Sequence, residues 1–257
     1  MSCLATRILF CVFLALPVSS RAATDIAAAC GAPDEFITSD EALAQVSVAI
    51  NAGGPVDILA IGSATTVGAV TAAGTSASVA QDAFPWRMLR ALQAELPKVQ
   101  FHITVRGGRG LTAEEMLPLL EAALKQQHYQ LVLWQTGTVE AVRGLRPDGL
   151  LELLHTGADL VRSTGGDLVL IDPQFSRFLR ANTDVDAYLG VMQQVATMPG
   201  VSLFRRFDLM RAWANDGGID LERAPKAERD KALDDLNDCL GQALARFVLS
   251  GVDVLKK

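Results

Sequence analysis

A run of apolar residues that leads into a turn of small residues constrains this chain more than any other feature. Residues 56–61 read Val-Asp-Ile-Leu-Ala-Ile, and an uninterrupted apolar run is typical of a strand covered on both faces. Gly62 permits a tight turn after the run, and Gly68 permits close packing of the segment that follows. The pattern therefore predicts a buried strand of a parallel sheet with a loop at its carboxyl end.

Strand-like and helical patterns alternate along the rest of the chain. Strands are predicted over residues 56–61, 99–105, 130–136, 167–171 and 201–204, and helices over 82–96, 112–127, 149–163, 184–197, 205–213 and 237–248. Residues 215–235 are charged and predict irregular structure. Alternation of this kind predicts an α/β fold: a three-layer doubly wound parallel sheet of the flavodoxin-like type.

The same fold class predicts where a ligand binds. In doubly wound sheets, ligands bind beyond the carboxyl ends of the strands. Four segments should therefore line any site, namely residues 62–68, 106–112, 135–142 and 172–177.

The size and charge of the chain narrow the possible functions. Its 257 residues suit one sizeable core, and no internal repeat or linker divides residues 55–257, which we interpret as a single domain. The formal net charge is −6 and the sequence pI is ≈ 5.1. Since no basic patch stands out, we expect no nucleic-acid partner.

The N-terminus has the pattern of a signal peptide, predicted over residues 1–22. Arg7 gives a positive start, residues 8–18 are mostly apolar, and Ser20-Arg21-Ala22 fits a cleavage site. The apolar stretch is too short to span a membrane, and a buried N-terminal element is the alternative. We expect export to the periplasm or the outside, no membrane span in the mature protein, and an N-terminal arm over residues 23–54.

Two cysteines, Cys30 and Cys239, remain after the predicted leader. In an oxidising compartment two cysteines favour one disulfide, which would join the N-terminal arm to the last helix. Two unpaired thiols are the alternative.

Several short blocks stand at the predicted strand ends. Residues 62–68 read Gly-Ser-Ala-Thr-Thr-Val-Gly, residues 106–110 Arg-Gly-Gly-Arg-Gly, and residues 133–141 Leu-Trp-Gln-Thr-Gly-Thr-Val-Glu-Ala. These blocks resemble the first three blocks of the SGNH (GDSL-type) hydrolases, and residues 171–175 and 203–211 resemble its bacterial secreted branch. The resemblance covers roughly residues 55–250. It implies the SGNH hydrolase fold and, for an active member, esters of small acids or acetylated sugars as substrates.

The resemblance also implies which residues should carry catalysis, and most of them are replaced. The nucleophilic serine falls on Ala64, the asparagine of the oxyanion hole on Val139, and the histidine base on Lys231, or on Asp235 in another register. Only Gly110, whose backbone N–H would stabilise the oxyanion, is kept. None of the histidines lies in the last hundred residues, where the base is required: the chain has only His102, His128 and His155. Acyl transfer needs a hydroxyl activated by a base, so these positions predict a degenerate site.

Two hypotheses for the function follow. The first is an exported SGNH-fold protein that has lost ester hydrolase activity and serves as a binding or scaffold module, for instance for carbohydrate or an envelope polymer. The second is an active esterase or acyl-sugar esterase in which Ser63 attacks and Gly110 stabilises the oxyanion.

The candidate binding residues belong to the segments at the strand ends. They are Ser63, Thr65, Gly110, Gln135, Glu140, Asp172 and Arg109. Ser63 is a candidate nucleophile, or it bonds the turn backbone. Glu140 and Asp172 are a candidate acid/base pair, or they are loop residues and partners of arginines.

Four arginines lie near these strand ends: Arg106, Arg109, Arg177 and Arg180. They could form a cleft that binds carboxylates or acidic sugars, and the alternative is that each is paired locally within its loop. No residues show metal-ligand spacing, and the glycine-rich 106–110 loop lacks the Gly-Lys-Ser/Thr of a phosphate-binding loop. We expect no metal and no cofactor, and a small-molecule or carbohydrate ligand. Trp134 is interpreted as a core residue.

Overall fold

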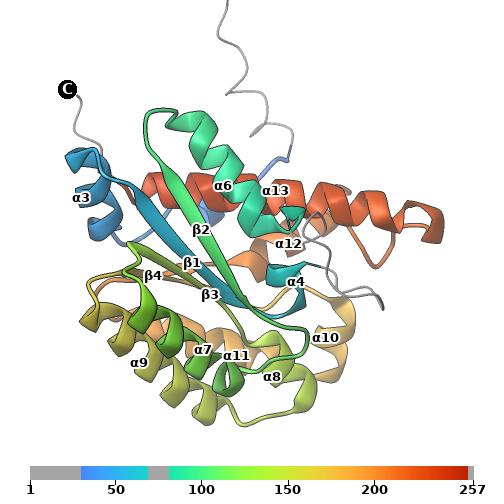
Figure 1. The fold of residues 1–257 in the computed structure, drawn as a ribbon. Coiled ribbons are helices and arrows are strands. Elements are labelled where there is room, and N and C mark those ends of the chain that lie inside the picture. Colours follow the sequence, from blue (N-terminus) through green and yellow to red (C-terminus); the bar gives the residue numbers. More distant parts are fainter. Residues whose placement is uncertain (1–29, 69–80, 254–257) are drawn as a thin grey trace, which may run out of the picture.

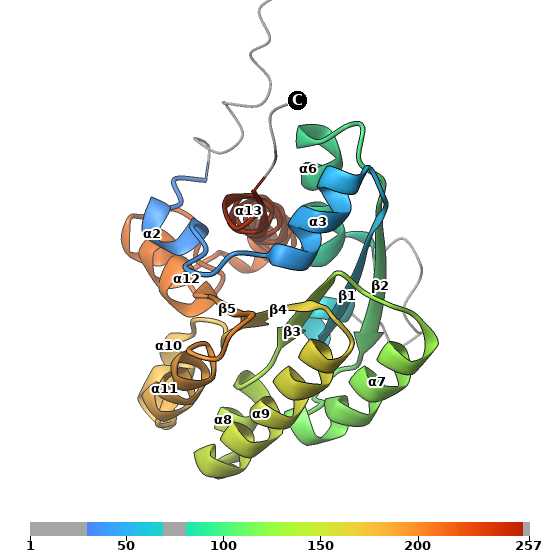
Figure 2. The ribbon, with the colours of Figure 1, turned by 90° about the vertical axis from the view of Figure 1, so that its left-hand side faces the viewer.

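The computed structural model describes residues 30–68 and 81–253, and within them five strands form one parallel sheet. The strands are β1 (Val56–Gly62), β2 (Phe101–Gly107), β3 (Leu131–Gln135), β4 (Asp167–Ile171) and β5 (Val201–Phe204). Their order is β2-β1-β3-β4-β5, and every neighbouring pair is parallel. Figure 1 labels β1 to β4, and Figure 2 labels all five strands. The chain reverses its direction of winding at β1, so the loops after β1 and β3 separate there and leave room for a site.

Helices cover both faces of this sheet, as Figure 2 shows. They are α2 (Asp34–Ile37), α3 (Ala44–Ala52), α4 (Ala64–Val67), α6 (Phe84–Glu95), α7 (Ala113–Gln126), α8 (Thr138–Arg143), α9 (Pro147–Ser163), α10 (Arg177–Asn182), α11 (Val185–Val195), α12 (Arg206–Asn215) and α13 (Arg229–Ser250). One layer contains α2, α3, α6, α12 and α13, and the other contains α7, α9 and α11. The three-layer doubly wound prediction is confirmed.

The core lies in two parts, one on each face of the sheet. Successive residues of β1 point to opposite faces, so Ile58 and Ala60 join one part while Leu59 and Ile61 join the other. This double coverage explains why the strand reads as an uninterrupted apolar run. Trp134 of β3 is fully buried, which confirms it as a core residue.

Residues 34–52 pack against the same core as the rest of the described chain. Leu43 and Val46 are fully buried, and the carboxylate of Asp167 accepts hydrogen bonds from the backbone N–H groups of Gln45 and Val46 at 2.8 and 3.1 Å. A buried carboxylate from the start of β4 therefore caps the first turn of α3.

The predicted disulfide between Cys30 and Cys239 is present, with the two Cα atoms 5.7 Å apart. It joins the start of the described chain to α13. The predicted leader, residues 1–22, lies outside the described residues. Across the described ranges, no helix has both the length and the hydropathy needed to cross a membrane.

The prediction of irregular structure over residues 215–235 is wrong in its last part, because α13 begins at Arg229. The charged residues there lie on the exposed side of the helix, and Lys231 pairs with Asp235 one turn later. A run of charged residues is therefore compatible with an exposed helix, and here it did not indicate irregular structure. The short helices α8 and α10 were also not predicted.

Candidate functional site

The loops at the carboxyl ends of the strands meet around the turn after β1 (Figure 1). Ser63 directly precedes α4, and Ala64, the position implied for the nucleophile, is the first residue of that helix. Gly62 is required at this turn, because a Cβ there would lie 2.2 Å from the Thr66 Oγ1 atom. The turn is therefore tightly packed against its neighbours.

Gln135, the last residue of β3, organises this turn. Its Oε1 atom lies 3.3 Å from Ser63 Oγ, 3.2 Å from Thr65 Oγ1 and 2.9 Å from Thr66 Oγ1, and the backbone N–H of Ser63 also points to it at 3.3 Å. The Gln135 side chain is 1% exposed. An amide oxygen has two lone pairs, so the four donors share it. The structure thus brings together three of the candidate binding residues, Ser63, Thr65 and Gln135.

The environment of Ser63 bears on its chemistry. Its hydroxyl donates to an uncharged amide oxygen, and among the described residues it has no carboxylate, lysine or histidine partner. A serine hydroxyl becomes a nucleophile only when a base removes its proton, and an amide oxygen is a very weak base. In this arrangement Ser63 acts as a hydrogen-bond donor that holds the turn.

A buried arginine lies beside the turn. Arg206, at the start of α12, donates from Nε to the backbone oxygen of Asp172 at 3.1 Å and from Nη1 to Thr65 Oγ1 at 3.3 Å. Its Nη2 atom is buried without a hydrogen-bond partner in the described part of the chain. The Asp172 carboxylate accepts from the Phe207 N–H at 2.8 Å. Arg206 therefore links the end of β4 to the turn after β1.

Burial changes the proton affinity of this pair. Desolvation raises the pKa of Asp172 to about 7, although the Phe207 N–H and the nearby Arg206 charge oppose the rise. Desolvation also lowers the pKa of Arg206 to about 10, against the attraction of Asp172. The position of Arg206, two residues beyond the end of β5, was the available signal in the sequence, but only the fold brings it within hydrogen-bond distance of Thr65.

Glu140 has a different set of partners from Asp172. Its carboxylate accepts hydrogen bonds from the Gly137 N–H at 2.9 Å, from Thr136 Oγ1 at 3.0 Å and from the Ala113 N–H. These donors belong to the starts of α7 and α8, so Glu140 joins two helix N-termini. No hydrogen bond joins Glu140 to Asp172 among the described residues, and their role as an acid/base pair stays a prediction.

Gly110 lies in the loop between β2 and α7, with a φ of +77° that favours glycine. Its carbonyl oxygen accepts a hydrogen bond of 2.8 Å from Nη2 of Arg143, a residue of α8 that sequence reasoning missed. The other Arg143 terminal nitrogen lies 3.7 Å from the Glu115 carboxylate. Arg109, one residue before Gly110, is exposed and has no ion-pair partner in the described chain.

The remaining implied positions lie elsewhere. Val139 is in the first turn of α8. Lys231 lies on the exposed side of α13, where its hydrogen bond to Asp235 raises the pKa of its ammonium group. Within the described ranges, neither Lys231 nor Asp235 forms a hydrogen bond or ion pair with the turn after β1. The extension of α13 places the residue that would align with the histidine on the outer surface of a helix.

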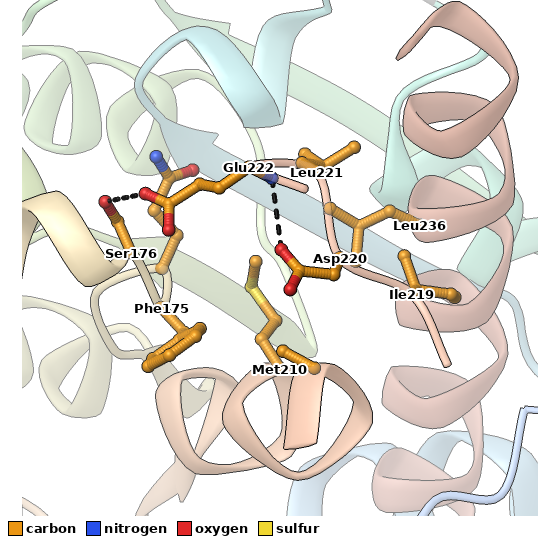
Figure 3. Close-up of a pocket in the computed structure, with 10 residues that line it drawn as sticks. Phe175, Ser176, Met210, Ile219, Asp220, Leu221, Glu222 and Leu236 are labelled. Carbon is orange, nitrogen blue, oxygen red and sulfur yellow. Dashed lines mark hydrogen bonds between the residues drawn. The ribbon is translucent and has the colours of Figure 1, made fainter. Parts of the chain in front are cut away.

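A pocket of about 120 Å³ lies next to the end of β4 (Figure 3). It is bounded by the loop after β4, by α12, by residues 219–222 and by α13. Its apolar side chains are Phe175, Met210, Ala214, Ile219, Leu221 and Leu236. Figure 3 shows Ser176 and Glu222 meeting at one side of the pocket and Leu221, Ile219 and Leu236 at the other.

The carboxylates of this pocket are already engaged. Glu222 accepts from Ser176 Oγ at 2.6 Å and from the Arg177 N–H at 2.9 Å, and Asp220 forms a 2.8 Å ion pair with Arg177. Desolvation raises the pKa of Glu222, but these hydrogen bonds outweigh it and hold the pKa below its ordinary value. Arg177 is therefore satisfied locally, and the charged groups fasten residues 219–222 to the start of α10.

No group of three or more histidine, cysteine or acidic side chains suited to a metal ion occurs among the residues that the structure describes. The candidate site is thus a polar network of hydroxyls, one amide, a buried arginine, a buried carboxylate and several further arginines, arranged around the carboxyl edge of the sheet.

Comparisons with known proteins place this arrangement in a family. The model of the non-GDSL lipase-like family matches residues 29–254. A search among curated proteins found none that matches.

Solved structures give the fold. A lipase/acylhydrolase from Enterococcus faecalis is 15% identical, with a TM-score of 0.55 over 79% of this chain and 100% of that one. An acetyl-xylooligosaccharide esterase from Geobacillus is 15% identical, with a TM-score of 0.60 over 78% of this chain and 97% of that one. A two-domain esterase active on acetylated mannans is 13% identical, with a TM-score of 0.61 over 83% of this chain and 55% of that one. The chain has the SGNH hydrolase fold that its sequence blocks predicted.

Proposed function

Because the chain belongs to the non-GDSL lipase-like family, we propose that it is an SGNH-fold protein that has lost ester hydrolase activity and binds a ligand at the carboxyl edge of its sheet. The ligand is a small molecule or a carbohydrate. In this proposal the ancestral catalytic site persists as a binding site.

The environment of Ser63 carries the proposal. Ala64 occupies the position implied for the nucleophile, and its methyl group cannot attack a carbonyl. The nearest rival, Ser63, donates its hydroxyl to the Gln135 amide oxygen at 3.3 Å, in place of a base. Val139 offers no side-chain donor to an oxyanion, and loss of one such donor lowers rates by about 10²–10³.

The carbohydrate part of the proposal has support from the comparisons. Two of the similar structures are esterases named for acetylated mannans and acetyl-xylooligosaccharides. A protein that shares the fold of such enzymes and lacks a nucleophile would be suited to bind the sugar and leave its ester intact.

Export is the second part of the proposal. The N-terminal pattern of residues 1–22 and the disulfide between Cys30 and Cys239 both favour an oxidising compartment, either the periplasm or the outside of the cell. Fractionation of cells that express the full chain tests this part, since a protein that stays in the cytoplasm contradicts it.

Turnover of p-nitrophenyl acetate and butyrate tests the loss of activity. Three purified proteins are compared: the wild type, Ser63→Ala and Ala64→Ser. We expect all three to hydrolyse both esters at the rate of buffer, because Ala64→Ser restores a hydroxyl without restoring a base. Turnover by the wild type that disappears in Ser63→Ala would instead show an esterase with a shifted nucleophile, and the proposal would fail.

A further inference from the structure

The pocket at the end of β4 is lined mostly by apolar side chains that come from separate segments. Met210 and Ala214 lie one turn apart on the same face of α12, and both are buried. In Figure 3 the Met210 side chain points from α12 into the space between Phe175 and the aliphatic side chains on the other side, which are Ile219, Leu221 and Leu236. The pocket is therefore suited to an apolar group.

The volume of the pocket limits the size of that group. The pocket measures about 120 Å³, and a cavity of about 150 Å³ lined by leucine, isoleucine and phenylalanine binds benzene. One six-membered ring therefore suits the pocket, with its substituent at the open side. A sugar ring of the same size carries hydroxyls all around it, and the aliphatic walls would leave those hydroxyls without hydrogen-bond partners.

Two side chains of the pocket favour an aromatic ring over a saturated one. Phe175 is held by Phe207, whose ring meets it edge to face with the centroids 5.4 Å apart, and by the Arg177 guanidinium, 5.5 Å from the Phe175 centroid. A further ring beside Phe175 would extend this aromatic cluster, and the sulfur of Met210 makes favourable contacts with ring edges. A saturated ring of the same size cannot make these contacts.

The charged side chains that line the pocket, Asp220 and Glu222, are already paired. Arg177 lies 2.8 Å from the Asp220 carboxylate and 3.6 Å from that of Glu222, and Arg223 lies 3.8 Å from Asp220. Two carboxylates thus face two guanidinium groups, so a charged ligand group finds no unpaired opposite charge among the described residues of the pocket. Because an unpaired charge is costly to bury, a neutral group is favoured.

One polar group of the pocket is left for the ligand. Gln174 lines the pocket and is partly buried, and its side-chain amide has no hydrogen-bond partner within the described ranges. Its backbone N–H donates to Thr138 Oγ1 at 3.1 Å, which fixes the residue at the end of β4. Since an amide both donates and accepts, Gln174 can bond a hydroxyl or a carbonyl attached to the ring.

The pocket adjoins the polar network around the turn after β1. Met210 follows Arg206 by four residues on α12, and residues four apart lie on one face of a helix, about 5–6 Å from each other. Arg206 in turn donates to Thr65 at 3.3 Å. A ligand held in the pocket is therefore close to the candidate site.

We propose that the pocket binds a neutral aromatic compound, with the ring between Phe175 and Met210 and an attached hydroxyl or carbonyl bonded to the Gln174 amide. The inference rests on the proposed function, because it takes the pocket as part of the ligand site at the carboxyl edge of the sheet. It names the chemical class of that ligand.

Titration with benzyl alcohol tests the proposal, with cyclohexylmethanol as the saturated match and benzylamine and benzoate as the charged matches. Nuclear magnetic resonance of protein labelled at the methionine methyl groups locates the binding. Met210, assigned through Met210→Leu, reports on the pocket, whereas Met88 and Met116 are fully buried in the core and serve as references. Benzyl alcohol should shift the Met210 signal with a Kd of about 1 mM or below. It should bind at least about threefold more tightly than each matched compound.

Two variants with matched controls test the contacts. Ala214→Leu fills the pocket from α12 and should weaken benzyl alcohol binding by about tenfold or more. Gln174→Leu removes the amide at nearly the same volume and should weaken binding by about threefold or more. Ala122→Leu on α7 and Gln193→Leu on α11 make the same changes at exposed positions and should leave the affinity unchanged. Circular dichroism of all variants shows whether each is folded.

The outcomes separate this inference from the proposed function. No binding of benzyl alcohol, binding that leaves the Met210 signal unchanged, equal affinity for a matched compound, or folded Ala214→Leu and Gln174→Leu variants that bind like the wild type would each overturn the aromatic-ligand inference. None of these results bears on ester turnover, which the p-nitrophenyl assay measures separately. Hydrolysis in that assay overturns the loss of activity, whichever compound the pocket binds.

Discussion

The hydrogen bonds to Gln135 give the sharpest prediction about stability. We consider Gln135→Leu, which keeps a similar side-chain volume and removes the amide. In the wild type, the hydroxyls of Ser63, Thr65 and Thr66 and the N–H of Ser63 all point to Oε1 within 3.3 Å. The substitution removes this shared acceptor from a turn in which Ser63 is 8% and Thr66 2% exposed.

The size of the effect follows from the number of full bonds lost. One amide oxygen has two lone pairs, so about two of the four contacts are full hydrogen bonds. A buried donor left without an acceptor costs about 1–3 kcal/mol. Because hydroxyls can rotate toward other acceptors, we expect the free energy of unfolding to fall by about 2–4 kcal/mol in Gln135→Leu. Cavity effects should be small, since the side-chain volume is conserved.

Urea unfolding followed by circular dichroism measures this change, provided that the slope against urea is the same for both proteins. Gln193→Leu on the exposed surface of α11 is the matched control, and it should change the unfolding free energy by no more than about 0.5 kcal/mol. A loss below about 1 kcal/mol in Gln135→Leu would refute the role of Gln135 as the organiser of the turn.

Three further predictions concern other parts of the molecule. Gly157→Ala should destabilise the fold by about 2 kcal/mol or more, because its Cβ would lie 2.1 Å from an indole carbon of Trp134 in β3. Gly149→Ala in the same helix has open space around the new Cβ and should stabilise the fold by up to about 1 kcal/mol. Thermal melts compare the two variants, and equal changes in melting temperature would contradict the close packing of Gly157 on Trp134. Burial raises the pKa of Asp167 to about 6, so the protonated form is favoured by folding, and stability should decrease as pH rises from about 4 to 6. In Asp167→Asn the difference in unfolding free energy between pH 4 and pH 7, measured by urea titration, should be smaller than in the wild type by up to about 3 kcal/mol. The same pH dependence in both proteins would contradict this role of Asp167. Reduction of the Cys30–Cys239 disulfide, which spans 209 residues, should lower the unfolding free energy by up to about 5 kcal/mol, and a melting temperature insensitive to dithiothreitol would show that the bond contributes little.

Much of the fold could be predicted because it depends on local patterns. The strand over residues 56–61 is uninterrupted and apolar because both of its faces are buried, and β1 extends it by one residue, to Gly62. Thr112 and Glu115 form the capping box that starts α7, and their spacing in the sequence was sufficient to place it. These signals involve residues within a few positions of each other.

The short helices α8 and α10 could not be predicted, because the residues that stabilise their starts include partners far away along the chain. The start of α10 is capped by Glu222, 45 residues beyond the Arg177 N–H that it accepts from. The start of α8 depends on Glu140, whose carboxylate also bonds the first residue of α7. Helices this short are not stable alone, so their existence depends on partners that only the folded chain supplies.

For the candidate site, too, some features depend on residue identity alone and others on contacts between distant segments. The sequence by itself determined which residues stand at the positions that the resemblance implies for catalysis, because Ala64, Val139 and the absence of a histidine in the last hundred residues are matters of residue identity and need no coordinates. Only the tertiary structure decided what the site contains. It directed the hydroxyls of the turn to Gln135, placed Arg206 beneath Thr65 and left Arg109 unpaired, because contacts between distant segments depend on how the strands are ordered in the sheet and not on spacing along the chain.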